Sequence, residues 1–256
     1  MSNTTSRGRF VWHQLNTPNA DAALAFYTSV CEWGNEAWQP DPSQPAYQMW
    51  KGSAGAHSGV MQMPPDSKDP AHWLGYISTP DVDATVNTVK GLGGALVFGP
   101  MDIPSVGRFA VMTDPDGAMF APFTPTQEMP PTPPGTGDFS WFELATRDIP
   151  KALAFYGAVF GWTAGDAMDM GPNGIYQFFN RDGQMMGGMY QVGESGPMAM
   201  PPGWTHYVTV ADLNAAVGRV KAGGGNVFVE TDIPGGRIAM CTDPQGAMFA
   251  LHWIAA

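Results

Sequence analysis

Two short segments of the chain carry the side chains best suited to chemistry, and they correspond at a spacing of 129 residues. Trp12 and Gln14 lie in the first segment, and Trp141 and Glu143 lie at the equivalent positions of the second. Because residues two apart in a strand point to the same face, each tryptophan shares a face with the polar residue that follows it. A carboxylate can accept a proton, whereas an amide only forms hydrogen bonds. The segments therefore predict similar surfaces with different chemical capability.

Other familiar reactive patterns are missing from the sequence. We find no P-loop, dinucleotide-binding fingerprint, Ser-His-Asp signature or Cys-x-x-Cys motif. Cys31 and Cys241 align with Phe160 and Met112 of the opposite segments, so neither cysteine belongs to a repeated framework. Two isolated thiols suit a reducing compartment, and a disulfide is not expected.

The elements that position these residues are duplicated. Residues 10–33 and 139–162 share 11 identities in 24 positions, and residues 108–121 and 237–250 share 10 in 14, all at the same offset of 129. A repeat of this length is far longer than a solenoid unit, so each copy should be able to bury its own core. We predict one domain over residues 8–124 and a second over residues 138–254.

The segment between the copies reads as a linker. Residues 124–138 carry five prolines and two glycines, which favour an extended chain without hydrogen bonds, and the linker proper is placed at residues 125–137. Within the first copy the pattern predicts a strand at 9–16, a helix at 19–31, strands at 47–51, 57–63 and 72–79, a helix at 81–92, and strands at 95–98, 107–113 and 118–123. This sequence of elements is β-α-β-β-β repeated twice in each copy.

Composition excludes several classes of partner. Lysine and arginine number 12 against 23 aspartate and glutamate residues, and the resulting net charge of −11 repels nucleic acid and anionic lipid. No apolar run approaches the ~18 residues of a membrane span, and residues 1–9 are too short and polar for a secretory signal. We expect a cytoplasmic protein, a monomer or homodimer, that interacts with neither nucleic acid nor membranes.

The element order and motifs resemble the vicinal oxygen chelate superfamily, which includes glyoxalase I, bleomycin-resistance proteins and extradiol dioxygenases. The motifs are the Ala-Leu-Ala-Phe-Tyr helices at 23–27 and 152–156, the Asp-Val-Asp-Ala helix start at 81–84, and the closing strand that follows Asp-Pro-x-Gly. The resemblance implies an α+β fold of tandem glyoxalase-like domains. Each domain would contain two βαβββ modules that form a curved mixed sheet around a cavity, where relatives hold a divalent metal, an antibiotic or another small molecule.

The same resemblance locates four metal-ligand positions in each copy. By alignment they fall on Trp12, Gln62, Leu74 and Ala121 in the first copy and on Trp141, Gln191, Thr205 and Ala250 in the second. Divalent metals require several converging nitrogen or oxygen ligands. Because three of the four positions in each copy hold side chains that are poor ligands, we expect no metal at the usual site and no other cofactor. A divalent metal would then require a displaced site, formed from Gln14, Gln62, Glu143, Gln191 and His252.

Strand alternation predicts what lines the cavity instead. The positions adjacent to the vacant metal sites bring Gln14, Glu143, Tyr76, Tyr207, Phe123 and His252 to the inward face, beside Trp12 and Trp141. Two groupings are open. Glu143, Tyr207 and His252 form one site if each copy builds its own, whereas Gln14 joins Tyr207 and His252, and Glu143 joins Tyr76 and Phe123, if the copies exchange strands.

Simpler interpretations remain for most of these residues. Trp12 and Trp141 are also good core residues, and Glu143 would be well satisfied by Arg108 or Arg237. His13 and His206 are out of phase with the inward face and are predicted to be structural. We expect His57 and His72 to be exposed to solvent.

Two functions follow from this reading. The first is binding of a small, partly apolar organic molecule, in resistance, sequestration or detoxification, with Trp12, Gln14, Tyr76, Trp141 and Tyr207 as ligand-binding residues. The second is a glyoxalase-like lyase or dioxygenase-type enzyme, metal-free or with the displaced metal site. Glu143 and His252 are its catalytic candidates.

Overall fold

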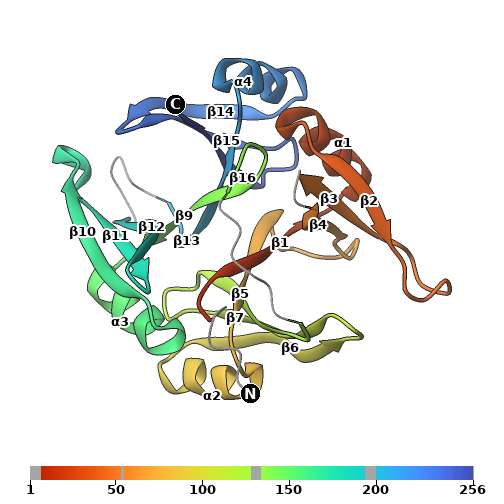
Figure 1. Ribbon diagram of the computed structural model, residues 1–256, viewed down its shortest axis with the longest axis horizontal. Helices are drawn as coiled ribbons and strands as arrows, with labels where there is room; N and C mark the ends of the chain where they lie inside the picture. The colour runs from red at the N-terminus through yellow and green to blue at the C-terminus, as the bar shows by residue number, and fades with distance from the viewer. Residues whose placement is uncertain (1–6, 53–54, 128–133, 194–199, 256) are drawn as a thin grey trace. The chain divides into compact units, whose positions relative to one another are not determined.

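The computed structural model describes residues 7–52, 55–127, 134–193 and 200–255. It contains two eight-stranded sheets with the same strand order (Figure 1). The first sheet runs β2-β3-β4-β1-β5-β8-β7-β6 and the second runs β10-β11-β12-β9-β13-β16-β15-β14. Each sheet is mixed, since β1 pairs with β4 and β5 with β8 in parallel while the remaining described pairs of the first sheet are antiparallel.

The elements of the first copy follow the duplicated βαβββ pattern. They are β1 (Phe10–Thr17), α1 (Ala20–Cys31), β2 (Gly34–Trp38), β3 (Tyr47–Gly52), β4 (Gly55–Gln62), β5 (His72–Ser78), α2 (Val82–Gly91), β6 (Ala95–Ile103), β7 (Gly107–Thr113) and β8 (Met119–Pro125).

The second copy repeats this order with one added 3₁₀ turn. Its elements are β9 (Phe139–Thr146), α3 (Ile149–Phe160), β10 (Thr163–Asp169), η1 (Gly171–Asn173), β11 (Ile175–Arg181), β12 (Gln184–Gln191), β13 (Gly203–Thr209), α4 (Leu213–Ala222), β14 (Asn226–Ile233), β15 (Gly236–Thr242) and β16 (Met248–Ile254). The α+β fold and the two βαβββ modules in each copy are confirmed.

The sequence pattern missed β2, the strand after α1. Four of the five residues of β2 are exposed, so this edge strand shows no alternation of apolar and polar residues. β6 is also longer than its predicted range of 95–98. Residues 128–133, within the predicted linker, lie outside the described residues.

The four α-helices within the described residues begin in the same way. An Asn or Asp precedes the first turn, and its side chain accepts a hydrogen bond from the backbone N–H three residues later. These caps are Asn19, Asp81, Asp148 and Asp212. Such a cap typically contributes about 1 kcal/mol, which makes the helix starts the best-defined boundaries in the sequence.

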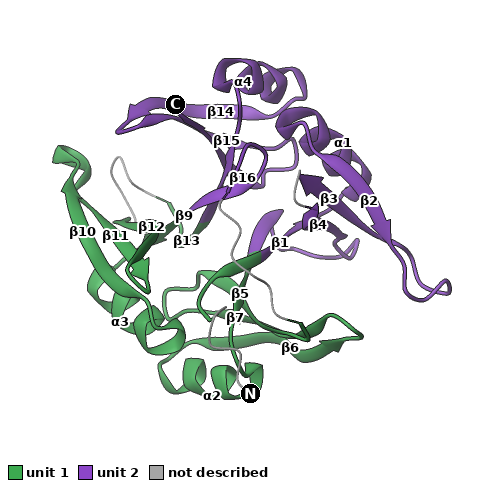
Figure 2. Ribbon diagram, viewed as in Figure 1, with its two compact units in different colours: residues 1–11, 75–132, 142–204 green, residues 12–74, 133–141, 205–256 purple. Residues whose placement is uncertain are grey.

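The chain divides into two compact units that do not coincide with the two copies (Figure 2). Unit 1 contains residues 1–11, 75–132 and 142–204, and unit 2 contains residues 12–74, 133–141 and 205–256. Unit 1 therefore combines the second module of the first copy with the first module of the second copy. Unit 2 combines the first module of the chain with the last.

In unit 2, the strands bury alternate residues against α1 and α4. Leu15, Trp50, Val60, Val208 and Leu251 belong to one apolar cluster with residues of both helices. Within this core Trp73 donates its indole N–H to the Tyr27 hydroxyl (3.0 Å), and Tyr27 donates to Asp243 (3.3 Å). Three segments far apart in the chain are joined by this buried series of hydrogen bonds.

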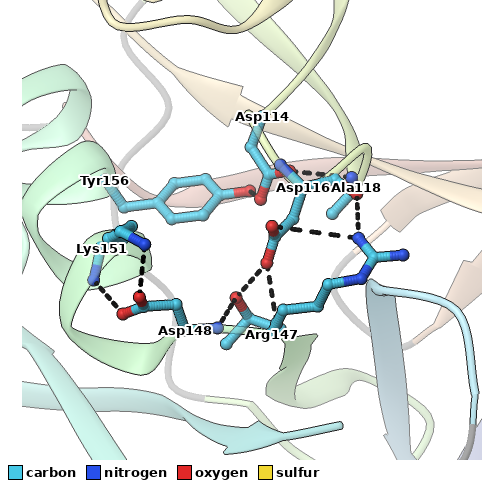
Figure 3. Close-up of polar contacts among 8 residues, drawn as sticks. Asp114, Asp116, Ala118, Arg147, Asp148, Lys151 and Tyr156 are labelled. Carbon is cyan, nitrogen blue, oxygen red and sulfur yellow. Dashed lines mark hydrogen bonds and ion pairs between the residues drawn. The ribbon is translucent and has the colours of Figure 1, made fainter. Parts of the chain in front are cut away.

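Unit 1 contains the equivalent series. Trp204 donates to the Tyr156 hydroxyl (3.0 Å), and Tyr156 donates to Asp114 Oδ2 (3.0 Å). Asp114 Oδ1 accepts two further bonds, from the backbone N–H groups of Asp116 and Ala118 in the turn between β7 and β8 (Figure 3). Burial raises the pKa of Asp114, and these donors, including Tyr156, partly oppose the rise.

The same turn is fastened to the start of α3 by Asp116. Its Oδ2 atom accepts hydrogen bonds from the Thr146 hydroxyl (2.8 Å) and the Arg147 backbone N–H (2.7 Å) (Figure 3). In unit 2 the equivalent residue is Gln245, which donates to the backbone carbonyl of Asn19 (3.0 Å). Each unit thus joins a turn from one copy to a helix of the other.

The sequence predicted neither a disulfide nor a membrane-spanning segment. Cys31 and Cys241 are free and buried. In the described parts of the chain, no helix is long and apolar enough to cross a membrane.

Candidate functional site

Each strand of unit 2 that packs on the helices has a second face, which we call the helix-free face. On β1, His13, Leu15 and Thr17 are buried, and the alternate residues Trp12, Gln14 and Asn16 are half-buried on the helix-free face. Tyr47 of β3 and His72 of β5 also lie on the helix-free face. Trp50 and Trp73, which are an odd number of residues away from them on the same strands, point to the opposite face and belong to the core.

These five side chains form one continuous series of hydrogen bonds. Trp12 Nε1 donates to the Tyr47 hydroxyl (3.3 Å), which donates to Gln14 Oε1 (3.2 Å). Gln14 Nε2 donates to Asn16 Oδ1 (3.0 Å), and Asn16 Nδ2 lies 3.2 Å from His72 Nε2. Trp12, Gln14 and Asn16 share this face by strand alternation, as predicted, and the structure adds Tyr47 and His72 to them.

The direction of this series is fixed at both ends. At one end, the indole N–H of Trp12 can only donate. At the other end, His72 Nδ1 lies 2.9 Å from the backbone carbonyl of Pro70, and a carbonyl can only accept. His72 therefore carries its proton on Nδ1, and its Nε2 accepts from Asn16. The helix-free face of unit 2 presents an ordered set of hydrogen-bond donors and acceptors.

Gly59 of β4 makes room for the Tyr47 ring. A Cβ atom at this position would lie 2.4 Å from the ring and hydroxyl of Tyr47, closer than van der Waals contact permits. Gly59 pairs with Gln14 on β1 and with Met49 on β3. The ring crosses the strand over this glycine and so brings the hydroxyl to Gln14.

Unit 1 repeats the construction at an offset of 129. Tyr176 of β11 donates its hydroxyl to Glu143 Oε2 of β9 (2.8 Å), and a Cβ atom on Gly188 would lie 2.1 Å from the Tyr176 ring. Gly188 pairs with Glu143 in the strand register. Glu143 is only 8% exposed. At the position where unit 2 has the Gln14 amide, unit 1 therefore has the buried carboxylate of Glu143.

Two more aromatic residues surround Gly188 in unit 1. Phe178 pairs with Gly188 across β11 and β12, and its ring lies 5.2 Å from that of Tyr176. Tyr190 is buried two residues after Gly188 on the same face, and its hydroxyl donates to Met200 Sδ (3.1 Å). Burial, and then the charge of Glu143, raise the pKa of Tyr190.

The remaining candidates divide between the units. Tyr76 belongs to unit 1, where its buried ring lies 5.5 Å from Phe109 and 6.1 Å from Phe123. Tyr207, Trp141 and His252 belong to unit 2. The units therefore hold Gln14 with Tyr207 and His252, and Glu143 with Tyr76 and Phe123, which is the exchanged grouping of the two that the sequence left open.

His252 is half-buried at the end of β16. Its Nδ1 lies 3.4 Å from the Ser140 hydroxyl, and burial lowers its pKa. Tyr207 is 2% exposed on β13 and pairs with Ala250 in register. Because strand partners share a face, Tyr207 and His252 both lie on the face opposite the buried Leu251.

The fold and these sites can be compared with known proteins. The sequence profile of the Glyoxalase/Bleomycin resistance protein/Dioxygenase superfamily matches residues 9–121 and again residues 138–251. The chain belongs to this superfamily.

Its curated relatives within the superfamily cover nearly the whole chain. A putative glyoxylase, CFP32, from Mycobacterium tuberculosis is 34% identical over 94% of this chain and 92% of its own. The anthracycline biosynthesis protein DnrV from Streptomyces peucetius is 30% identical over 95% of this chain and 92% of its own.

Among solved structures, the fold is similar to that of the 2,3-dioxygenase LapB from Pseudomonas sp. KL28. The TM-score is 0.65 at 12% identity, over 99% of this chain and 94% of the dioxygenase. The Mn(II)-bound glyoxalase from Novosphingobium aromaticivorans gives a TM-score of 0.63 at 16% identity, over 97% of this chain and 82% of the glyoxalase. These likenesses establish the fold.

The superfamily's metal positions do not fit a metal in this member. Trp12 uses its indole N–H on Tyr47, and Leu74, Ala121, Thr205 and Ala250 are all buried, with only the Thr205 hydroxyl as a possible ligand. Across the described residues, no group of three or more His, Cys, Asp or Glu side chains is arranged to hold a metal ion.

Gln62 is occupied elsewhere, which argues against its part in a displaced metal site. Its Oε1 accepts from the backbone N–H of Ala20 (2.9 Å), and its Nε2 donates to the Pro18 carbonyl (2.5 Å). The side chain therefore fastens the end of β4 to the start of α1. This role was not visible from its alignment with a metal position.

Several of the simpler interpretations are wrong. Arg108 pairs with Asp83 and Asp102, and Arg237 contacts Asp232 and Asn214, so these arginines are committed to exposed partners on their own modules. His57 and His72 are half-buried instead of exposed. The His57 ring lies 4.8 Å from Trp33, and burial lowers its pKa to about 4, while His72 ends the series described above.

His13 and His206 lie within the core of unit 2. They are 4% and 0% exposed, their ring centroids are 5.1 Å apart, and His13 stacks on Phe139. Burial lowers the pKa of both, to about 3 for His206. They lie on the strand face opposite the candidate ligand residues.

Tyr47 and Tyr176, which bond to the candidate residues Gln14 and Glu143, were not predicted from the sequence. A signal was present, since each tyrosine is followed twelve residues later by a glycine, at 59 and 188. A crevice of about 330 Å³ also opens in unit 2, lined by Cys31–Gly34, Lys51, Gly52, Thr136, Gly137, Val210 and Ala211. None of the predicted site residues lines this crevice.

Proposed function

We propose that this protein binds a small, partly apolar organic molecule on the helix-free face of unit 2, which carries the Tyr47–Gln14 pair, and on the equivalent strand face of unit 1, which carries the Tyr176–Glu143 pair; we call both helix-free faces. One observation carries the proposal: the same tyrosine-over-glycine construction occurs in both units, beside positions where relatives hold a metal and where this chain has tryptophan. Ordered hydrogen-bonding groups bordered by aromatic rings are what a largely apolar ligand with a few polar groups requires.

The relatives suggest the kind of molecule. Two are named anthracycline biosynthesis proteins, and an anthracycline is a flat polycyclic aromatic compound with polar substituents. We propose a ligand of this class, with sequestration, resistance or detoxification as the role. A cytoplasmic location and a monomeric or dimeric state are part of the same proposal, and the two free, buried cysteines are compatible with them.

Isothermal titration of the protein with an anthracycline tests this function. We expect binding that is weakened about tenfold by Tyr47→Phe or by Tyr176→Phe, because each substitution leaves a polar partner without its hydrogen bond. Ile175→Ala is the matched control, since Ile175 is exposed and adjacent to Tyr176 on the opposite strand face. Equal affinities in all variants would refute the proposed site.

A glyoxalase-like lyase is the second candidate. Glu143 favours it, because a buried carboxylate held by Tyr176 is a suitable proton acceptor, and one relative is named a putative glyoxylase. A glyoxalase assay together with elemental analysis distinguishes the two functions. Turnover that disappears in Glu143→Gln while ligand binding persists would establish the enzyme. Stoichiometric metal that survives dialysis, with activity lost on chelation, would also favour it.

A further inference from the structure

We propose that the crevice of unit 2 binds the guanidinium group of a small alkylguanidinium compound. The crevice has a volume of about 330 Å³, which is the volume that about eleven water molecules occupy in the liquid. In unit 1 the equivalent place is taken by an arginine side chain of the chain itself. The residues of the helix-free faces do not line the crevice, so this proposal is independent of the proposed function.

Both units hold the backbone beside this place in the same way. In unit 2, Trp33 donates its indole N–H to the Gly137 carbonyl (2.6 Å). In unit 1, at an offset of 129, Trp162 donates its indole N–H to the Gly8 carbonyl (2.7 Å). The N–H of each glycine donates in turn to the carbonyl of the last residue of β13 in unit 2 and of β5 in unit 1. The difference between the two places therefore comes from their side chains.

The side chain that distinguishes them is that of Arg181. Its Nε donates to the Arg7 carbonyl, its guanidinium pairs with Asp182 (2.9 Å), and the side chain is only 13% exposed. In unit 2 the residues at the positions of Arg181 and Arg7 are Gly52 and Thr136, and both line the crevice. The crevice is therefore the space that remains where unit 2 has glycine instead of arginine.

The acceptors beside the crevice suit a guanidinium group. A Cβ atom on Gly52 would lie 3.1 Å from Asp138 Oδ1, so this carboxylate lies where the missing side chain would begin. Its Oδ2 accepts from the Gly135 N–H (2.9 Å), which holds the carboxylate in place. The Thr136 carbonyl is the counterpart of the acceptor that Arg181 uses in unit 1. Hydrogen bonds from a cation to a carboxylate are about twice as strong as neutral ones.

The charged side chains that line the crevice are already paired. Glu32 pairs with Arg219 (3.1 Å), and Lys51 pairs with Glu36 (3.5 Å). None of the ion pairs among the described residues involves Asp138, so its charge sets the preference for a cation. A guanidinium is favoured over an ammonium group because its planar set of N–H donors can reach the carboxylate and a carbonyl together.

The experiment compares propylguanidinium, which reproduces the arginine side chain, with its neutral counterpart propylurea. Binding to the full chain is followed by NMR of the ¹⁵N-labelled indole groups, since Trp33 lines the crevice and Trp162 reports on the equivalent place in unit 1. Trp33→Phe and Trp162→Phe assign the two signals. We expect propylguanidinium to shift the Trp33 signal alone, with a Kd on the order of millimolar, and propylurea to bind about tenfold more weakly.

Two variants locate the site. Gly52→Arg gives unit 2 the arginine of unit 1 and should weaken propylguanidinium binding more than about tenfold, because the crevice is then filled. Gly91→Arg is the control, since it adds the same charge to α2 of unit 1, where a Cβ atom would meet nothing within 4 Å. Asp138→Asn keeps an oxygen for the Gly135 N–H and should weaken binding about tenfold. Thermal unfolding confirms that each variant is folded.

The proposal would be overturned by any of three results. These are a Trp33 signal that propylguanidinium does not shift, equal affinities for propylguanidinium and propylurea, and a folded Gly52→Arg or Asp138→Asn variant that binds as tightly as the wild type. Anthracycline binding by the same Gly52→Arg variant is expected to be unchanged, so failure of this site is distinguishable from failure of the proposed function.

Discussion

The tyrosine that crosses a glycine is the smallest feature on which the candidate sites depend. A Cβ atom on Gly188 would lie 2.1–2.3 Å from the Tyr176 ring, although the backbone of Gly188 is not in the left-handed region. The glycine is therefore required by the ring alone. Gly59 stands in the same relation to Tyr47.

We predict that Gly188→Ala displaces Tyr176 from Glu143 and lowers the free energy of unfolding by about 1–3 kcal/mol. Denaturant unfolding and the near-ultraviolet tyrosine spectrum measure the two effects. Gly203→Ala is the control, because its Cβ atom would meet nothing within 4 Å. A Gly188→Ala variant as stable as this control would show that the ring is free to move away at no cost.

The buried histidines predict a dependence of stability on pH. Burial lowers the pKa of His206 to about 3 in the folded protein, whereas in the unfolded chain it is near 6.5. Between these values only the unfolded state binds the proton, so stability is lost as pH falls below about 6.5. Asp114 and Asp243 act in the opposite direction, since burial raises their pKa and makes ionisation unfavourable as pH rises.

Replacing His206 with phenylalanine should therefore reduce the acid sensitivity, by up to about 1.4 kcal/mol per pH unit between pH 6 and pH 4. Unfolding free energies of the wild type and variant at several pH values test this. Parallel curves would mean that His206 takes up a proton without unfolding the protein.

At the scale of elements, each unit contains a turn that holds a helix start in place: the turn between β7 and β8 in unit 1, and the turn between β15 and β16 in unit 2. In unit 1, Asp116 accepts hydrogen bonds from Thr146 and from the Arg147 backbone, while in unit 2 the equivalent Gln245 makes one bond to Asn19. We predict that Asp116→Ala destabilises the protein by about 1–3 kcal/mol and that Gln245→Ala has a smaller effect. Thermal unfolding of the two variants gives the comparison, and equal losses would contradict it.

Element types were largely predictable, but their partners were not. Helix starts are local signals, and α1 and α2 begin one residue after the predicted starts at Asn19 and Asp81, which serve as their caps. The edge strand β2 was missed because it buries too little to show alternation. The bonds of Tyr47 to Gln14 and of Gln62 to the start of α1 depend on strand order, which no local pattern encodes.

At the scale of the whole molecule, the exchange of modules between copies explains why sequence left the site groupings open. Tyr27 and Tyr156 occupy equivalent positions in the two copies, as do Asp114 and Asp243. The sequence is therefore equally compatible with a tyrosine–aspartate hydrogen bond within each copy and with one between the copies. The structure pairs Tyr27 with Asp243 and Tyr156 with Asp114. Because both choices bury the same groups, only the three-dimensional arrangement distinguishes them.

We predict that residues 8–124 expressed alone form a homodimer. In this fragment Asp114 lacks its partner Tyr156, but Tyr27 of a second fragment molecule can supply the equivalent hydroxyl. The first module of one molecule would then pack its apolar surface against the second module of the other. Light scattering after size-exclusion chromatography measures the mass. A stable, folded monomer would show that a single copy completes its own core.

The claim that ligand binds on the helix-free faces is tested most directly by NMR of protein labelled with ¹³C in its seven tyrosines. Tyr27 and Tyr156 lie in the buried cores and serve as internal references, while Tyr47 and Tyr176 lie on the proposed sites. Tyrosine-to-phenylalanine variants assign the signals. Addition of an anthracycline should shift Tyr47 and Tyr176 and leave Tyr27 and Tyr156 unchanged. Saturable binding that leaves both Tyr47 and Tyr176 unmoved would place the ligand elsewhere and contradict the account.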